Sequence, residues 1–233
     1  MTLLRGLIEL ATLLLCRAKR HQRIRIAAAT QPVKVNLGCG LAVAPGWINV
    51  DGSLNAFIAN LPALSHRMAY RVTGANRYYS QEEYCRILSS SRFIHHDLSF
   101  GIPLPDASAD YVYTSHFVEH LFRPDAERLL REMRRVLKPS GIARISVPDL
   151  EYAISLYSLG DKERMLAQYF FVDDKESYFA RHKYMYDEQL LSELMGRVGF
   201  SRIYRCGFRQ GAVPDIAILD NRPEESLYVE AVK

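Results

Sequence analysis

The stretch VNLGCGLAVAPGWINVDGS, residues 35–53, decides the fold of this chain. It places a loop with two glycines, Gly38 and Gly40, between two apolar runs, and the second run ends on Asp51. Glycine lets a backbone approach a ligand closely, because it lacks a Cβ atom and tolerates positive φ. A tight turn between two buried strands would use the same residue types. The rest of the chain therefore has to decide between a ligand loop and a simple turn.

Downstream of Val33, short apolar runs alternate with helical patterns. The stretch 123–141 predicts an amphipathic helix that ends at Lys138-Pro139. A second amphipathic helix is expected in residues 187–200. This alternation predicts an α/β fold with a largely parallel sheet and helices on both faces. The expected strands are residues 33–37, 47–51, 92–98, 109–115 and 143–148, followed by two terminal strands in 202–208 and 226–232.

The connection between the first two expected strands is unusually short. It holds only nine residues, 38–46. A crossover that contains a helix needs at least about 10–12 residues, and Pro45-Gly46 favours a turn. We therefore expect at most one helical turn in this connection.

Ligands of such sheets lie outside the carboxyl ends of the strands. The loop 38–40 follows the first expected strand, Asp51 ends the second and Asp97 follows the third. A carboxylate after the second strand can accept hydrogen bonds from both hydroxyls of a ribose. A nicotinamide fingerprint would need a third glycine where Val43 stands, so no pyrophosphate cradle is indicated. The pattern favours a nucleoside ligand without phosphates.

Three segments carry a resemblance to a known family: VNLGCG, HHDLSFGIPLPDASADYVYTSHFVEHL and LLREMRRVLKPSGIARISVPD. Together they resemble the class I S-adenosylmethionine-dependent methyltransferases, in the branch called methyltransferase type 11. The resemblance runs from about Val33 to Asp149. It implies a Rossmann-like fold with a mostly parallel seven-stranded sheet, S-adenosylmethionine as the cofactor, and methyl transfer as the reaction.

The resemblance also assigns the cofactor residues. In that family the glycine loop lies under the methionine part of the cofactor, the acid after the second strand binds the ribose, and the acid after the third strand reaches the adenine. Asp51 departs from the family pattern, because the short connection makes its distance from Gly40 unusual. The implied cofactor-binding residues are Leu37, Gly38, Cys39, Gly40, Asp51, Gly52, Asp97 and Leu98, with Ser115 next to the methyl group.

Histidine is the expected source of a general base. Methyl transfer depends mostly on proximity and orientation, but a hydroxyl acceptor must also lose its proton. The candidate catalytic residues are His116, directly after the fourth strand, and His182, before the penultimate helix. His120 is expected to pack at a helix start instead. No metal site is expected, because His95-His96 are strand neighbours that point to opposite faces and have no third ligand in register.

The N-terminus differs in character from the rest of the chain. Residues 1–34 carry seven Lys or Arg against one acid, whereas the remainder carries 23 basic and 25 acidic residues. Residues 3–15 predict an amphipathic helix with a basic run after it, too short for a membrane span. Three interpretations stay open: peripheral contact of residues 3–25 with an anionic membrane, docking on the protein itself or a second subunit, and nucleic-acid contact.

Residues 1–30 are thus expected to form a separate N-terminal segment, and residues 31–233 one methyltransferase domain. Two aromatic-rich segments, 54–91 and 150–186, either determine which substrate binds or simply pack onto the sheet.

The leading expectation is a small-molecule, glycan or lipid-linked acceptor methylated on oxygen. The slightly acidic body disfavours a nucleic-acid acceptor, and a non-catalytic scaffold is the third alternative. The chain has four cysteines and no CxxC pair, which indicates a location in the reducing cytoplasm. If the N-terminal helix binds a membrane, the protein would lie at the inner face of that membrane. The sequence leaves open whether the protein forms a homodimer.

Overall fold

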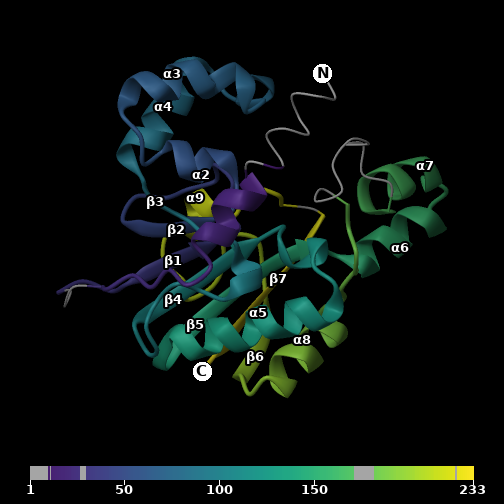
Figure 1. Ribbon diagram of the computed structural model, residues 1–233. Coiled ribbons are helices and arrows are strands. Elements are labelled where there is room, and N and C mark those ends of the chain that lie inside the picture. Colours follow the sequence, from purple (N-terminus) through teal and green to yellow (C-terminus); the bar gives the residue numbers. More distant parts are fainter. Residues whose placement is uncertain (1–9, 11, 27–29, 171–180, 224) are drawn as a thin grey trace.

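A seven-stranded sheet forms the centre of the computed structural model (Figure 1), which describes residues 10, 12–26, 30–170, 181–223 and 225–233. The strand order is β3-β2-β1-β4-β5-β7-β6. Strands β1 to β5 run parallel, and β7 pairs antiparallel with both β5 and β6. The strands are β1 Lys34–Leu37, β2 Trp47–Asp51, β3 Arg92–His95, β4 Ala109–Ser115, β5 Leu137–Pro148, β6 Ser201–Cys206 and β7 Ser226–Val232.

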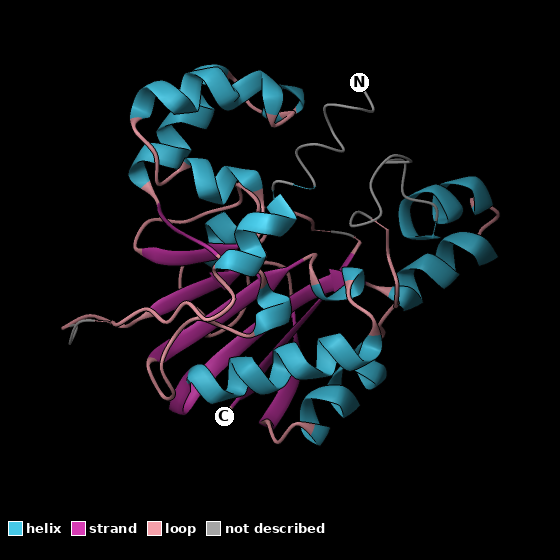
Figure 2. Cartoon of the chain, in the orientation of Figure 1, coloured by secondary structure: helices cyan, strands magenta, loops and turns pink. Residues whose placement is uncertain are grey.

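Helices cover the sheet on both faces, as expected from the sequence (Figure 2). The main core lies between the sheet and α5 and α8, whose apolar side chains pack against alternate residues of β4 and β5. The opposite face of β2 and β4 packs against α9 through Trp47 and Tyr113. The helices of these layers are α5 Arg123–Val136, α8 Glu188–Arg197 and the short α9 Ile216–Leu219.

The end of α5 differs from the expectation. The helix stops at Val136, and β5 begins at once with Leu137, so Lys138-Pro139 lie inside a strand. The physical reason is that Leu137 pairs with Ala109 of β4, and a shift of register between Ala109 and Tyr111 extends the pairing. Strand β5 is therefore longer than the expected residues 143–148.

The connection between β1 and β2 contains no helix, as predicted: residues 38–46, all described, form turns and bends. The Asn36 side-chain amide of β1 donates a hydrogen bond to the Ala42 carbonyl oxygen at 2.9 Å and holds the loop. Helices follow β2 instead. They are α2 Leu54–Ile58, α3 Ala63–Val72, the short η1 Ala75–Arg77 and α4 Gln81–Ser90.

Two groups of helices extend beyond the sheet in Figure 1, α2–α4 on one side and α6–α7 on the other. In the first group the buried Tyr84 packs with Leu88 and Phe93, so this aromatic residue serves the packing of the segment. In the second, Tyr169 is buried against Ala153 and Leu156. The second group consists of α6 Leu150–Ser158, α7 Lys162–Met165 and the π-helix η4 Leu166–Phe170; the aromatic residues Phe171, Tyr178 and Phe179 lie outside the described residues.

The N-terminal helix, described at residues 12–18, contacts the protein's own domain. The Cys16 thiol lies 3.6 Å from the Gly52 carbonyl oxygen and 3.7 Å from His95 Nε2. Leu10, Leu13 and Leu14 are about half exposed. Within the described part of the chain, every helix is too short or too polar to cross a membrane.

Candidate active site

The predicted cofactor residues gather at one edge of the sheet, because β1 to β4 are parallel and end side by side. Gly38 and Gly40 follow β1 with φ values of +61° and +53°. A Cβ atom on Gly38 would lie 2.3 Å from the Phe117 ring, whereas one on Gly40 would meet no described atom within 4 Å. Gly38 thus lets the loop pack closely on the segment after β4, and Gly40 borders open space.

Asp51 joins this loop to β2. Its Oδ2 accepts a hydrogen bond from the Gly40 amide at 2.8 Å, and its Oδ1 accepts one from the Ser53 amide at 2.7 Å. The side chain is buried, with 7% of its surface exposed. Asp51 therefore lies next to Gly40, although the connection between them is shorter than the family pattern has it.

Asp97 and Leu98 lie beside Asp51 at the same edge. Asp97 caps the short helix η2, Leu98–Phe100, by accepting a hydrogen bond from the Ser99 amide at 2.8 Å. A Cβ atom built on Gly52 would lie 3.6 Å from the Asp97 Cα atom. Two carboxylates after neighbouring strands thus border one region of the surface.

The Cys16 thiol lies next to both of these carboxylates. Burial, followed by the negative charges of Asp97 and Asp51, raises the pKa of Cys16 to about 11. Burial also raises the pKa of Cys39 in the glycine loop. Both thiols are therefore protonated and poorly nucleophilic near neutral pH.

A cluster of histidines follows β4. Ser115 is the last residue of β4, and His116 follows it with a left-handed φ of +49°. This backbone conformation is uncommon for a residue with a Cβ atom. His116 Nε2 lies 2.8 Å from the Ser226 hydroxyl of β7, and its Nδ1 lies 3.4 Å from Glu119 Oε1. His116 thus directly follows β4, as expected from the sequence, and lies between Ser226 of β7 and Glu119; its catalytic role stays a prediction.

Glu119 lies at the centre of the cluster, in the short helix η3 Val118–His120. Its side chain is completely buried, and neither carboxylate oxygen has a hydrogen-bond partner among the described residues. Burial alone would raise the pKa of Glu119, but the imidazoles of His116 and His120 outweigh burial and lower it. Glu119 is therefore a buried, ionised carboxylate with free acceptor capacity.

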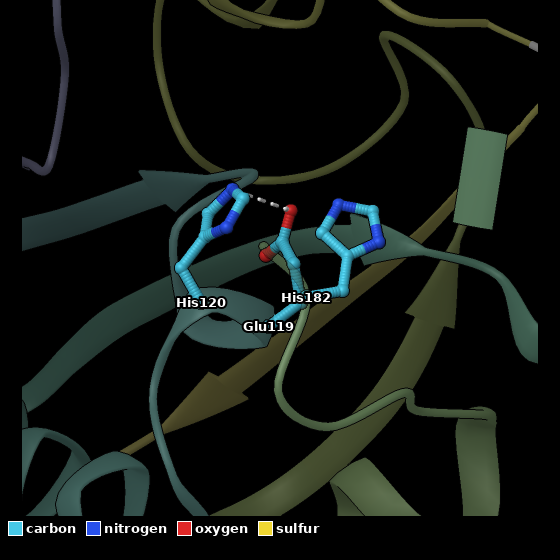
Figure 3. A group of neighbouring side chains, drawn as sticks. All are labelled: Glu119, His120 and His182. Carbon is cyan, nitrogen blue, oxygen red and sulfur yellow. Dashed lines mark ion pairs between the residues drawn. The ribbon is translucent and has the colours of Figure 1, made fainter. Parts of the chain in front are cut away.

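His182 comes from a distant segment and meets His120 over Glu119 (Figure 3). The rings of His120 and His182 lie 5.1 Å apart. The Glu119 carbonyl oxygen accepts hydrogen bonds from the amides of Lys183 and Tyr184 at 2.7 and 3.2 Å, which fixes the two segments together. Burial lowers the pKa of His182, despite the opposing charge of Glu119.

Glu119 was not singled out from the sequence, and His120 was expected to pack at a helix start, because EH before an amphipathic helix has the pattern of an ordinary helix start. The available signal was their position directly after β4, three and four residues beyond His116. His182 was predicted as a catalytic residue, and that role stays a prediction. Its contact with Glu119 could not be predicted, because the two residues are 63 positions apart in the chain.

A pocket of about 460 Å³ adjoins the histidine cluster at the ends of β5 and β6. It contains Asp149 and Arg205, which form an ion pair at 2.7 Å. Ser226, the hydrogen-bond partner of His116, is also in its wall. Tyr152, Phe208 and Tyr228 add aromatic surface. The pocket can therefore offer both charged groups and apolar rings to a ligand.

Comparison with known proteins supports this architecture. Residues 55–145 match the family described as "Methyltransferase domain". The matched residues begin after the glycine loop and Asp51, so they include β3 and β4 but neither of those features. Residues 55–145 therefore match the family that the sequence resemblance had led us to expect.

Two proteins of Mycobacterium tuberculosis, each named a probable S-adenosylmethionine-dependent methyltransferase, are 46% identical over 48 residues. These residues make up 21% of this chain and 17% of each relative, so the likeness covers a small part of either protein.

The fold as a whole is similar to the crystal structure of a SAM-dependent methyltransferase from Archaeoglobus fulgidus, with a TM-score of 0.53 and 18% identity over 97% of this chain and 94% of that chain. The class I methyltransferase fold predicted from the sequence is thus confirmed.

Proposed function

We propose that this protein is an S-adenosylmethionine-dependent methyltransferase that methylates an oxygen atom of a small-molecule, glycan or lipid-linked acceptor. The observation that carries the proposal is the glycine loop joined to Asp51 beside open space at Gly40. A nucleoside cofactor fits there because the loop exposes backbone close to the ligand and two carboxylates stand beside it.

The cofactor roles follow the order of the strands. The loop from Leu37 to Gly40 would lie under the methionine part, and Ser115 would lie near the methyl group. Asp51 and Gly52 would hold the ribose, and Asp97 with Leu98 would hold the adenine. The Asp51 carboxylate keeps lone pairs for ribose hydroxyls after accepting one backbone hydrogen bond on each oxygen.

When bound, S-adenosylmethionine supplies a methyl group on a sulfonium whose departure leaves a neutral thioether. The protein then has to align the acceptor, exclude water and accept the acceptor's proton. His116 and His182 are the candidate bases. The lowered pKa of His182 keeps its ring neutral near pH 7, as a base requires.

The acceptor would enter through the pocket beside Ser226. Its Asp149–Arg205 pair offers a hydrogen-bond acceptor and donors to sugar or polar headgroup atoms, and its aromatic side chains suit rings and apolar chains. The pocket adjoins His116 through Ser226, so an acceptor there would lie close to the predicted methyl position.

The test is calorimetric titration of the full chain with S-adenosylmethionine and S-adenosylhomocysteine, comparing wild type, Gly40→Ala, Asp51→Asn and Gly74→Ala. Gly74 is the matched control, because it also has a left-handed φ, +74°, and open space at its Cβ position, but it lies between α3 and η1. We expect wild type and Gly74→Ala to bind alike. Gly40→Ala and Asp51→Asn should each bind at least about tenfold more weakly, which corresponds to about 1.4 kcal/mol.

Absence of binding by the wild-type protein would contradict the proposal and favour a scaffold that keeps the fold. Equal weakening by Gly40→Ala and Gly74→Ala would show that the effect comes from backbone strain rather than from occupied space. Binding lost only in Gly40→Ala would move the ribose ligand away from Asp51.

The same proposal includes peripheral contact with the inner face of a membrane through residues 3–25, of which residues 3–9 and 11 lie outside the described residues. Its support is the exposure of Leu13 and Leu14, at 46% and 58%, next to a run of Lys and Arg. Sedimentation with vesicles containing anionic lipid tests it. Leu13→Gln/Leu14→Gln should lose vesicle binding, whereas the control Leu64→Gln/Met68→Gln on α3 should keep it; unchanged partitioning of the first variant would remove the support.

A further inference from the structure

The two histidines over Glu119 use their outer ring nitrogens in the same way. His120 Nδ1 lies 3.2 Å from the Arg181 carbonyl oxygen, and His182 Nδ1 lies 2.7 Å from the Tyr169 carbonyl oxygen. A carbonyl oxygen only accepts hydrogen bonds, so both Nδ1 atoms must carry the proton. In each neutral ring the Nε2 atom is then left with a free lone pair.

The carboxylate of Glu119, which lies between the two rings, accepts no hydrogen bond from the described residues. His120 Nε2 lies 3.7 Å from Glu119 Oε1, which is too long for a hydrogen bond. One ligand atom from each of Glu119, His120 and His182 lies within 4.8 Å of the others. In Figure 3 both rings present an edge to the carboxylate. A fully buried carboxylate whose oxygens have no hydrogen-bond partner among the described residues is unfavourable unless a positive charge compensates it.

We propose that Glu119, His120 and His182 bind a divalent transition-metal cation. Two imidazole nitrogens and one carboxylate form a ligand set typical of Zn²⁺ and Fe²⁺ sites that keep open positions. Metal-bound histidines characteristically donate their other ring N–H to a carbonyl or carboxylate oxygen, which fixes the ring and its tautomer. Both histidines here already have that arrangement.

His116 supports this site from outside the ligand set. Its Nε2 atom is engaged by the Ser226 hydroxyl at 2.8 Å, and its Nδ1 lies 3.4 Å from Glu119 Oε1. This position suits an orienting role for His116, which holds the carboxylate toward the two rings. The link through Ser226 also connects the cation site to the pocket proposed for the acceptor.

The consequence for catalysis rests on the proposed methyltransferase function. Three protein ligands leave a position open for the acceptor hydroxyl, and a bound cation lowers the pKa of such a hydroxyl. Its proton passes to water, and the oxygen lone pair forms the new bond to the methyl carbon. The carbon–sulfur bond breaks with its electron pair on sulfur, which gives S-adenosylhomocysteine. With the cation bound, His182 is a ligand rather than the base.

The experiment is titration of the chelator-treated chain, residues 1–233, with Co²⁺, followed by visible absorption, together with calorimetric titration with Zn²⁺. We expect one equivalent of each metal to bind the wild-type protein, and Glu119→Gln, His120→Ala and His182→Ala each to bind at least about tenfold more weakly. His120 is the safest position for folding, because its side chain is 23% exposed. His21→Ala is the matched control, since it removes an exposed imidazole bonded only to the neighbouring Arg20 in the described chain.

Two results would overturn the proposal: no binding of either metal by the wild-type protein, or binding that all three variants retain. Thermal unfolding of each variant, without metal, shows whether it is folded before its metal affinity is compared. Because this measurement needs neither cofactor nor acceptor, it can fail while cofactor binding succeeds, and the reverse. Failure of the cation site is thus separated from failure of the proposed methyl transfer.

Discussion

Two buried clusters of charged side chains in this molecule are built in opposite ways. The first joins Arg144 of β5 to Asp220 and to Glu230 of β7, and all three side chains are fully buried. The second is the group formed by Glu119, His120 and His182. Both contain buried carboxyl groups in the interior beside the sheet, but only in the first do these groups accept hydrogen bonds from the described residues.

In the first cluster every charged group is paired. Arg144 contacts Asp220 at 2.6 Å and Glu230 at 2.9 Å, and it also donates to the carbonyl oxygens of Gly207 and Gln210. Burial would lower the pKa of Arg144, but these carboxylates outweigh burial and raise it. In the second cluster the Glu119 oxygens accept no hydrogen bond from the described residues. The comparison suggests a general difference. A buried cluster whose charged groups are all paired links strands of the sheet, whereas a buried cluster whose carboxylate lacks hydrogen bonds is able to bind an external ligand.

Arg144→Met is expected to have the largest effect on stability. It would leave two carboxylates buried without their cation, at a cost of about 3–5 kcal/mol in the free energy of unfolding. Urea unfolding followed by circular dichroism measures it. The matched control is Arg128→Met, because Arg128 also contacts a carboxylate at 2.6 Å but is 55% exposed, and should cost no more than about 1 kcal/mol.

Glu119→Gln applies the same measurement to the open cluster. In metal-free protein it removes a buried charge that the neighbouring imidazoles favour but that accepts no hydrogen bond from the described residues, so we expect the free energy of unfolding to fall by no more than about 1 kcal/mol. A loss as large as that of Arg144→Met would show that Glu119 is a structural group, and the contrast between the clusters would break down.

A smaller effect is expected from pH. Burial lowers the pKa of His95, His96 and His182 below 6.5, so between the lowered values and 6.5 the unfolded chain binds more protons than the folded one. Stability is then fully present above about pH 6.5 and falls on acidification, by less than about 1.4 kcal/mol per pH unit for each group. Urea unfolding between pH 7.5 and 5.5 measures this slope, and His182→Gln should make it shallower. A slope identical in the two proteins would contradict the assignment to His182.

The sequence predicted the strand–helix alternation well, and it placed Gly40, Asp51 and Asp97 at one edge of the sheet, because these are local signals. Apolar runs bounded by turn residues marked the strands, and nine residues were too few for a crossover helix. The start of β5 was wrong because a long-range pairing, Leu137 with Ala109, overrode the proline signal. Local patterns contain no information about such a pairing.

The buried clusters could not be predicted for a related reason. Arg144 is separated from Asp220 by 76 residues and from Glu230 by 86, and His182 lies far from Glu119 in the chain. Only the folded sheet brings these residues together. Three interpretations of the N-terminal segment were left open, and the structure shows one contact of the kind expected for docking on the protein's own domain, between Cys16 and Gly52. The boundary between residues 1–30 and 31–233 stays a prediction.

The short connection between β1 and β2 also bears on the order of folding. Lys34 pairs with Trp47 across only a small loop, and the entropy lost on closing a loop grows with its length. The glycine loop and Asp51 can therefore assemble from contacts that are near in the chain, whereas β6 joins the sheet only through β7. Rates of folding fall as contacts become more distant in sequence. The edge proposed for the cofactor thus belongs to the part of the sheet that can form first, and the face beside the acceptor pocket waits for the last strand pair.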